Sequence, residues 1–142
     1  MERSPVLDRP FESFRVGEQA SLVRVVTEED LEAFARLSGD HNPLHIDDGY
    51  AEATEYGRRV AHGWLVAAPI SALAGHLLPG RRGLLLGARL SFVRPVFPGD
   101  RLTYQATVTH VSEATKVVKV QVDVTNQDGA VVLRGAYEGR VR

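Results

Sequence analysis

A carboxylate and an imidazole lie five positions apart in this chain, at Asp40 and His45. Proton transfer at a carbon atom needs groups of different acidity held near one reacting atom, and an acid with a histidine can supply them. Pro43 stands between the two residues and disfavours helix at the residue before it, so the pair is predicted to lie on a turn. The apolar neighbours Leu44 and Ile46 indicate a partly apolar setting, in which pKa values shift easily.

The same segment has two other interpretations. Asp, Asn and Pro are the residues that ordinary turns use, so it can be a loop without chemistry. It can also be a metal site, because His41 and His45 have the spacing that places two ligands on one helical face. Further candidate ligands nearby in the chain are Asp40, Asp47 and His62. Pro43 argues against a helix across this spacing, and the sequence therefore predicts no metal and no cofactor.

A second candidate group is the backbone of Gly63, near the start of an apolar stretch that runs from Val60 to Leu78. A glycine at the start of a helix can offer its N–H to a developing oxyanion, because no Cβ hinders the ligand. The alternative is that Gly63 only begins the helix. Four arginines are expected to be solvated loop charges, with contact to a phosphate as the alternative: Arg58, Arg59, Arg81 and Arg82.

The elements that position these residues are predicted to be helices. One helix is expected from Glu28 to Ser38, with Thr27 as its N-cap and Gly39 at its end. A short helix capped by an aspartate is expected around residues 47–53. Residues 63–78 are apolar nearly all round, which predicts a fully buried helix that is kinked at Pro69.

Strand patterns flank the helices. Residues 14–27 are strand-like, and the chain after residue 83 alternates apolar and polar residues in four runs separated by turns. Short connections between successive strands predict an antiparallel sheet. The predicted fold class is therefore α+β: a single antiparallel sheet wrapped around the buried helix in a hot-dog arrangement. One domain is expected over residues 1–142, with residues 1–10 as a loose N-terminal arm.

Composition excludes several classes of protein. The net charge is −1 without a basic block, so no nucleic-acid partner is expected. The chain has no cysteine, which excludes disulfides, thiolate metal sites and a cysteine nucleophile. The apolar stretch is interrupted by His62, Pro69 and His76, which favours a core helix over a membrane span. The first residues have no apolar leader, so we expect a cytoplasmic protein with no membrane partner.

Three segments together resemble a known family. Residues Ala33–His45 are similar to the hydratase-2 signature of the MaoC-like dehydratases, the (R)-specific enoyl-CoA hydratases. The similarity continues through Tyr56–Gly63 and Leu90–Asp100, and spans most of the chain from about residue 14 to 141. The resemblance implies a hot-dog fold and a homodimer whose two sheets join. It also implies reversible hydration of a trans-2-enoyl thioester, carried by CoA or acyl carrier protein, to an (R)-3-hydroxyacyl thioester without a cofactor.

The resemblance also implies roles for individual residues. Asp40 and His45 match the pair that holds the catalytic water, and Asn42 matches the residue that supports the turn. The Gly63 N–H matches the group that binds the thioester oxygen. Ser71 occupies a position that lies near the site in some members.

The chain departs from the family pattern at two positions. Trp64 stands where methionine is common, and it either narrows the acyl tunnel or fills the core. Pro69 lies inside the central helix and can shift Ser71 away from the site.

Two other functions fit the same fold and ligand. One is a thioesterase, in which water attacks the carbonyl carbon instead of the double bond. The other is a non-catalytic subunit that binds acyl thioesters. The sequence leaves both open, together with the length of the acyl chain, the carrier and the direction of the reaction.

Overall fold

The computed structural model describes residues 4–142 and contains one five-stranded antiparallel sheet. Its strand order is β1-β3-β4-β5-β2, so the first two strands of the chain form the two edges. The strand bounds are β1 Gln19–Val25, β2 Gly83–Phe92, β3 Arg101–Ser112, β4 Val117–Thr125 and β5 Val131–Val141. The predicted four strands after residue 83 and their antiparallel pairing are confirmed.

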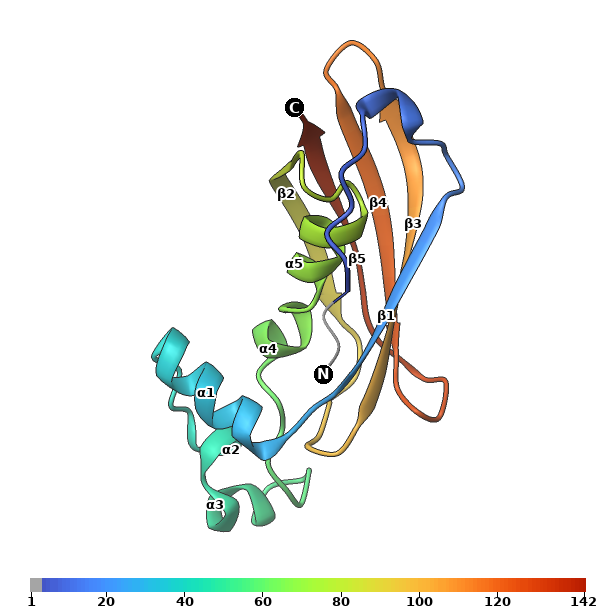
Figure 1. Cartoon of the computed structure of the whole chain (residues 1–142). Helices are drawn as coiled ribbons and strands as arrows, with labels where there is room; N and C mark the ends of the chain where they lie inside the picture. The colour runs from blue at the N-terminus through green and yellow to red at the C-terminus, as the bar shows by residue number, and fades with distance from the viewer. Residues whose placement is uncertain (1–3) are drawn as a thin grey trace.

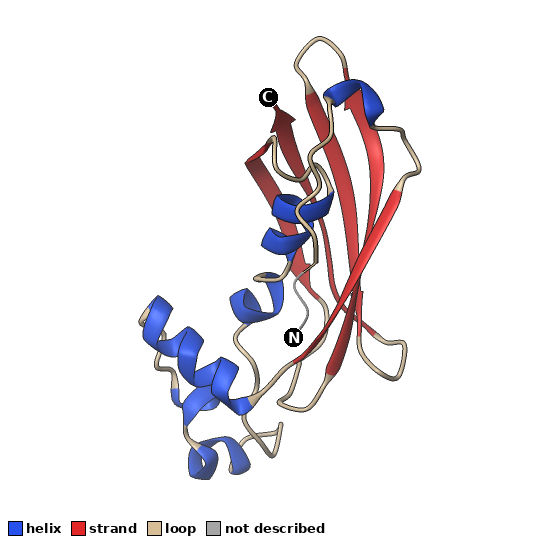
Figure 2. Ribbon diagram, in the orientation of Figure 1, coloured by secondary structure: helices blue, strands red, loops and turns tan. Residues whose placement is uncertain are grey.

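The helices form two groups in space (Figure 1, Figure 2). The central helical run lies along one face of the sheet, and the other group lies beyond the start of this run. The bounds of this second group are α1 Glu28–Ser38, α2 Pro43–Ile46 and α3 Asp48–Glu52. The central run consists of α4 Gly63–Ala67, α5 Ile70–Ala72 and a π-helical turn, η2, Leu73–Leu77. This sheet around a central helix is the expected hot-dog arrangement.

The core lies between the sheet and the central run. Every second residue of β4 points into it, and these four valines are at most 1% exposed: Val118, Val120, Val122 and Val124. From the central run, Leu73 is fully buried against them in the same cluster. Burial of one such side chain stabilises the fold by about 1.5–3 kcal/mol, so this alternation fixes which face of the sheet the helix covers.

Helix α1 begins and ends where the sequence predicts. The side-chain oxygen of Thr27 accepts from the Asp30 N–H, and the Asp30 carboxylate accepts from the Thr27 N–H, which together form a capping box. Gly39 ends the helix with φ +78°, a left-handed conformation that favours glycine. The helix therefore ends at Ser38, two positions before Asp40.

The central helix differs from the prediction in two ways. It is divided at Pro69, which lacks the N–H needed to continue the ladder, rather than merely kinked there. It is also not buried all round, because Trp64, Ala68, Ser71 and Gly75 are exposed. Their spacing of three to four residues places them on one face of the helix. The prediction of complete burial was wrong because a single chain has only one sheet to cover the helix.

The first strand is shorter than predicted. Phe11–Ser13 form a 3-10 turn, and Gly17 has φ +91°, so the chain bends before β1 begins at Gln19. The strand prediction for residues 14–18 was therefore wrong.

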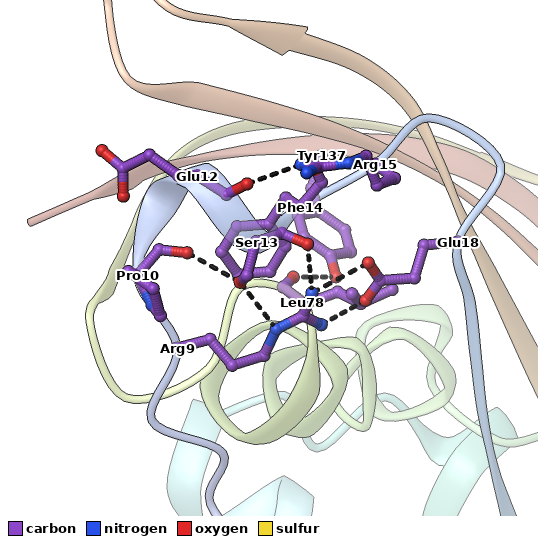
Figure 3. Close-up of polar contacts among 9 residues, drawn as sticks. All are labelled: Arg9, Pro10, Glu12, Ser13, Phe14, Arg15, Glu18, Leu78 and Tyr137. Carbon is purple, nitrogen blue, oxygen red and sulfur yellow. Dashed lines mark hydrogen bonds and ion pairs between the residues drawn. The ribbon is translucent and has the colours of Figure 1, made fainter.

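The N-terminal segment runs over the end of the central helix. The Leu7 N–H donates to the His76 carbonyl, and the Leu7 carbonyl accepts from the Arg81 N–H. The Arg9 guanidinium pairs with Glu18 and lies 4.2 Å from the centre of the Phe14 ring (Figure 3). These contacts join residues 7–9, part of the expected loose arm, to the domain, while residues 1–3 of that arm lie outside the described residues.

The same close-up shows how the end of the central helix is joined to the sheet (Figure 3). The hydroxyl of Tyr137, on β5, donates to the Leu78 carbonyl. Burial raises the pKa of Tyr137, so the hydroxyl keeps its proton and stays a donor. Within residues 4–142, no helix combines the length and the hydropathy needed to cross a membrane.

Candidate active site

Asp40 lies on the short loop between α1 and α2. Its N–H donates to the Ser38 Oγ, and its Oδ1 accepts from the Asn42 N–H at 3.1 Å. The other oxygen, Oδ2, lies 3.9 Å from the Nε2 of His45, and the carboxylate is about half exposed, at 49%. The hydrogen bond within the loop therefore holds Oδ1, while Oδ2 faces His45.

Asn42 supports this loop. Its Oδ1 accepts from the Leu44 N–H at 3.0 Å, so it is the N-cap of α2, and Pro43 occupies the first helical position. Proline is favoured there because its missing N–H would have no partner inside the helix. This cap starts the single helical turn that carries His45.

His45 points its two ring nitrogens in different directions. Nδ1 lies 2.6 Å from the Val60 carbonyl, and because a carbonyl can only accept, Nδ1 carries the proton of the neutral ring. Nε2 is then an acceptor, and it faces the Asp40 carboxylate, which is also an acceptor. Only 15% of the His45 side chain is exposed. The backbone of Val60 therefore sets the tautomer of His45.

Two acceptors 3.9 Å apart are arranged to hold one water molecule. A hydrogen bond of about 2.8 Å from each atom brings them to the same water oxygen, which then donates both hydrogens. The lone pairs of that oxygen are left pointing away from the pair. A carboxylate and an imidazole in such an arrangement are able to orient a water as a nucleophile and to accept its proton.

Gly63 lies at the edge of the neighbouring cavity. The cavity has a volume of about 380 Å³ and is lined by His45 and Gly63 together with the segment after β2. Gly63 is the first residue of α4, and such an N–H has no acceptor inside its own helix. A Cβ at this position would lie 3.2–3.3 Å from the Phe92 ring, which is tighter than ordinary contact. Tyr56 and Arg94 also line the cavity, and the other lining residues are apolar: Leu44, Val60, Ala61, Val66, Phe92, Val93, Pro95, Val96 and Val132.

Ser71 does not share this cavity. It lines a separate space of about 120 Å³ with Ala74, Gly75 and residues at the end of the sheet. The break at Pro69 lies between Gly63 and Ser71. Trp64 is 66% exposed and meets Phe92 edge to face with ring centroids 6.1 Å apart, so the interpretation of Trp64 as core filling is wrong.

His62 is a polar residue of this site that the sequence indicated only as a candidate metal ligand. Its side chain is 2% exposed, and its ring stacks on His45 with centroids 3.9 Å apart. Its Nε2 lies 3.1 Å from the Asp40 carbonyl. Burial is the main cause that lowers the pKa of His62, so the ring favours its neutral form.

The arrangement suits proton transfer better than a metal ion. Ligand atoms of Asp40, His45 and His62 lie within 4.8 Å of one another. However, one nitrogen of each histidine already faces a carbonyl, and the two rings are stacked with their planes 25° apart. The remaining lone pairs lie in nearly parallel planes and do not converge on one point, as a metal ion requires. His41, the other candidate ligand in the sequence, is exposed and turned toward the Gly39 carbonyl.

Arg59 is buried, so the prediction of a solvated loop charge was wrong for this residue. Its guanidinium lies 3.0 Å from both Glu32 and Asp48 and 3.3 Å from Glu28. Burial acts to lower the pKa of Arg59, but the three carboxylates outweigh it and raise the pKa. Arg59 thus joins α1 and α3 to the segment before α4, in which the carbonyl of the next residue, Val60, accepts from His45.

We predict that Arg59→Ala lowers the free energy of unfolding by about 1–3 kcal/mol, because three carboxylates lose the cation with which they form ion pairs. Urea denaturation followed by circular dichroism measures this change. Arg58→Ala is the matched control, since Arg58 lies over the Phe97 ring, with its guanidinium carbon 4.1 Å from the ring centre, and makes none of the three ion pairs. Equal losses in the two variants would contradict the role of Arg59.

The sequence did not predict several contacts of this site, and these contacts differ in whether a local pattern could have indicated them. His62 interrupts an otherwise apolar stretch, and a polar residue in such a position is a recognisable sign of a functional or hydrogen-bonded group. The carboxylate partners of Arg59 lie 11, 27 and 31 positions away, on two helices whose packing no local pattern reports. Phe92 and Val132 meet at the cavity only because β2 and β5 pair.

Comparison with known proteins identifies the family of the chain. The family model described as "MaoC like domain" matches residues 15–130. The chain is 38% identical over 124 residues to the (R)-specific enoyl-CoA hydratase of Aeromonas caviae, covering 87% of this chain and 92% of that protein. It is 39% identical over 125 residues to the (R)-specific enoyl-CoA hydratase of Rhodospirillum rubrum, covering 88% and 86% of the two chains.

A solved structure shows the same likeness in three dimensions. The (R)-hydratase from A. caviae, described as involved in PHA biosynthesis, superposes with a TM-score of 0.89 at 36% identity. The alignment covers 92% of this chain and 99% of that one. Because both the family model and full-length relatives match, the chain belongs to the family of MaoC-like domains.

Proposed function

We propose that the protein is an (R)-specific enoyl-CoA hydratase, which adds water reversibly to a trans-2-enoyl thioester. The observation that carries the proposal is the pair of acceptors 3.9 Å apart, Asp40 Oδ2 and His45 Nε2, beside the cavity that Gly63 lines. The names of its relatives in A. caviae and R. rubrum support the reaction and the (R) configuration.

In this proposal, the two acceptors hold the water against the β-carbon of the substrate. Addition of the water oxygen places negative charge on the thioester oxygen, where the Gly63 N–H donates to it. The proton lost from the water passes to Asp40 or His45 and then to the α-carbon, so that one water is added in total. The two groups face one another and act as a coupled pair. Helix α4 has only five residues, so the N–H itself contributes more than a helix dipole.

The reaction is tested with trans-2-enoyl-CoA substrates of increasing chain length. Hydration removes the enoyl absorbance without releasing a thiol, which a thiol-reactive dye measures in the same sample. Release of free CoA would instead favour a thioesterase. Binding of the substrates without either change would favour a non-catalytic subunit and would contradict the hydratase.

We predict that Gly63→Ala lowers kcat/KM about tenfold or more, because the new Cβ hinders approach of the thioester oxygen to the N–H and pushes the Phe92 ring, which lines the same cavity. Phe92 is about half exposed and can shift, so the free energy of unfolding should change little. Steady-state hydration kinetics and thermal melting measure the two effects. Gly49→Ala is the control, since a Cβ there meets only the Asp47 carboxylate at 3.5 Å. A full rate in Gly63→Ala would contradict the role of this N–H.

A homodimer also forms part of the proposal. Strand β2 is a sheet edge, and three successive leucines on it are at least 50% exposed: Leu84, Leu85 and Leu86. The exposed face of the central helix, at Trp64, Ala68, Ser71 and Gly75, consists of small or apolar side chains except for one hydroxyl. An unpaired apolar edge strand invites pairing with another chain, and a second copy would cover both surfaces.

We predict that Leu85→Lys shifts the protein from dimer to monomer, because it places a charge on the free edge. Analytical ultracentrifugation measures the change. Val16→Lys is the control, because Val16 is 65% exposed and lies in the turn before β1, the strand at the opposite edge of the sheet. A wild-type protein that remains monomeric at micromolar concentration would contradict the dimer.

A further inference from the structure

His62 contacts Asp40 and His45, and it precedes Gly63 in the chain. Its ring stacks on the His45 ring with the planes 25° apart. Its Nε2 lies 3.1 Å from the carbonyl of Asp40, the residue whose carboxylate faces His45. The next residue in the chain is Gly63. On its other side the ring packs on Phe34 of α1, with centroids 4.8 Å apart, so it is held between α1 and α2.

The hydrogen bonds place protons on opposite nitrogens of the two stacked rings. A carbonyl oxygen can only accept, so His62 carries its proton on Nε2, where it faces Asp40. His45 carries its proton on Nδ1, where it faces Val60. The His62 Nδ1 is then a buried acceptor, and within residues 4–142 it has no hydrogen-bond partner. A second proton there would be a buried donor without an acceptor.

We infer that His62 is a positioning residue of this site, which fixes the main chain at Asp40 through its Nε2–H and sets the plane of the His45 ring by stacking. The expected effect of His62 on kcat rests on the proposed hydratase function. Its hydrogen bond to Asp40 and its stacking on His45 do not depend on that function. His62 does not line the cavity, and its Nε2–H is directed to the Asp40 carbonyl, so we expect it to act through Asp40 and His45. A displacement of about 1 Å in such groups can slow a reaction about a hundredfold.

The charge state of His62 follows from the groups around it. Burial lowers its pKa most, the bond to the Asp40 carbonyl and the Asp40 carboxylate raise it, and His45 and His41 lower it. Below a pH of about 6.5 the unfolded chain therefore binds a proton that the folded protein resists. The free energy of unfolding falls as the pH drops from this value toward the lowered pKa of the folded state. Substitution of His62 removes this part of the pH dependence.

Three substitutions separate the two contacts. His62→Gln keeps an N–H donor for the Asp40 carbonyl, and His62→Phe keeps a flat ring on His45, whereas His62→Ala keeps neither. We expect His62→Ala to lower kcat about 10–100-fold with KM changed less than about threefold, and the other two to lie between it and the wild type. His110→Ala is the control, since His110 is exposed on β3. A folded His62→Ala with unchanged kcat would overturn the inference.

Nitrogen-15 NMR of histidine-labelled protein tests the geometry without substrate. In the wild type we expect His62 protonated on Nε2 and His45 on Nδ1, with resonances assigned by single substitution of the five histidines. In His62→Phe and His62→Gln the His45 shifts should move, whereas in His110→Ala they should not. An Nδ1-protonated His62 in the wild type, or an unmoved His45, would overturn the inference. A wild type that hydrates no enoyl thioester would refute the proposed function and leave these NMR outcomes to decide the role of His62.

Discussion

Asp40→Asn should lower kcat for hydration of an enoyl thioester about 10²–10⁴-fold, the range that a general base contributes. The amide keeps an oxygen to accept from the Asn42 N–H, so the loop after α1 retains its main-chain geometry. What changes is the group at the position of Oδ2, which becomes a poor acceptor for the proton of the water. Stopped or steady-state assays of enoyl absorbance at saturating substrate measure the loss.

Asp47→Asn is the matched control for this substitution. Asp47 is an exposed aspartate close in sequence, and its Oδ1 accepts from the Tyr50 N–H as the N-cap of α3. Asparagine caps helices about as well as aspartate, so stability should be retained. Similar losses in both variants would mean that negative charge in this region, and not the Asp40 carboxylate, supports the rate.

His45→Asn should lower kcat about 10²–10³-fold for a complementary reason. The asparagine amide reaches the Val60 carbonyl in place of Nδ1–H, so the hydrogen bond to the segment before α4 is retained. The acceptor at Nε2 is lost, and the water keeps only one of its two partners. Kinetics at saturating substrate should show the loss in kcat with a smaller change in KM, because the substrate cavity is otherwise intact.

His41→Asn provides the comparison for His45. His41 is the other histidine of the HxxxH spacing, it is exposed, and its Nδ1 faces the Gly39 carbonyl, which the amide can also reach. We expect its rate to stay within about twofold of the wild type. A large loss in His41→Asn together with a small loss in His45→Asn would show that His41 supports the reaction, and would contradict the role of His45.

The sequence predicted the elements whose signals are local. Helix α1 runs from Glu28 to Ser38 because a capping residue, a periodic apolar face and a terminal glycine all lie within twelve positions. Strand β4 alternates valines with polar residues, and the structure buries those valines. The central helix shows where local patterns fail: its residues are apolar on all sides, yet the pattern does not say which side one chain covers.

The candidate site likewise has a part that one short segment of the sequence predicts and a part that only packing creates. Asp40, Asn42 and His45 could be selected from one short segment because their residue types carry the chemistry. The cavity that faces them depends on β2, β5 and the loop after residue 92, which are brought together only by the sheet. The stacking of His62 on His45 and the ion pairs of Arg59 likewise join residues that are 11 to 31 positions apart. Such contacts form only through tertiary packing, so no spacing of residues in the sequence predicts them.

A double-mutant cycle on Asp40→Asn and His45→Asn tests the central claim most directly, because that claim is that both residues hold one water. If they do, removing the second partner adds little once the first is gone, and kcat of the double variant should lie within about threefold of the slower single variant. If the two losses multiply, the residues act independently, and the shared water between Asp40 Oδ2 and His45 Nε2 is contradicted.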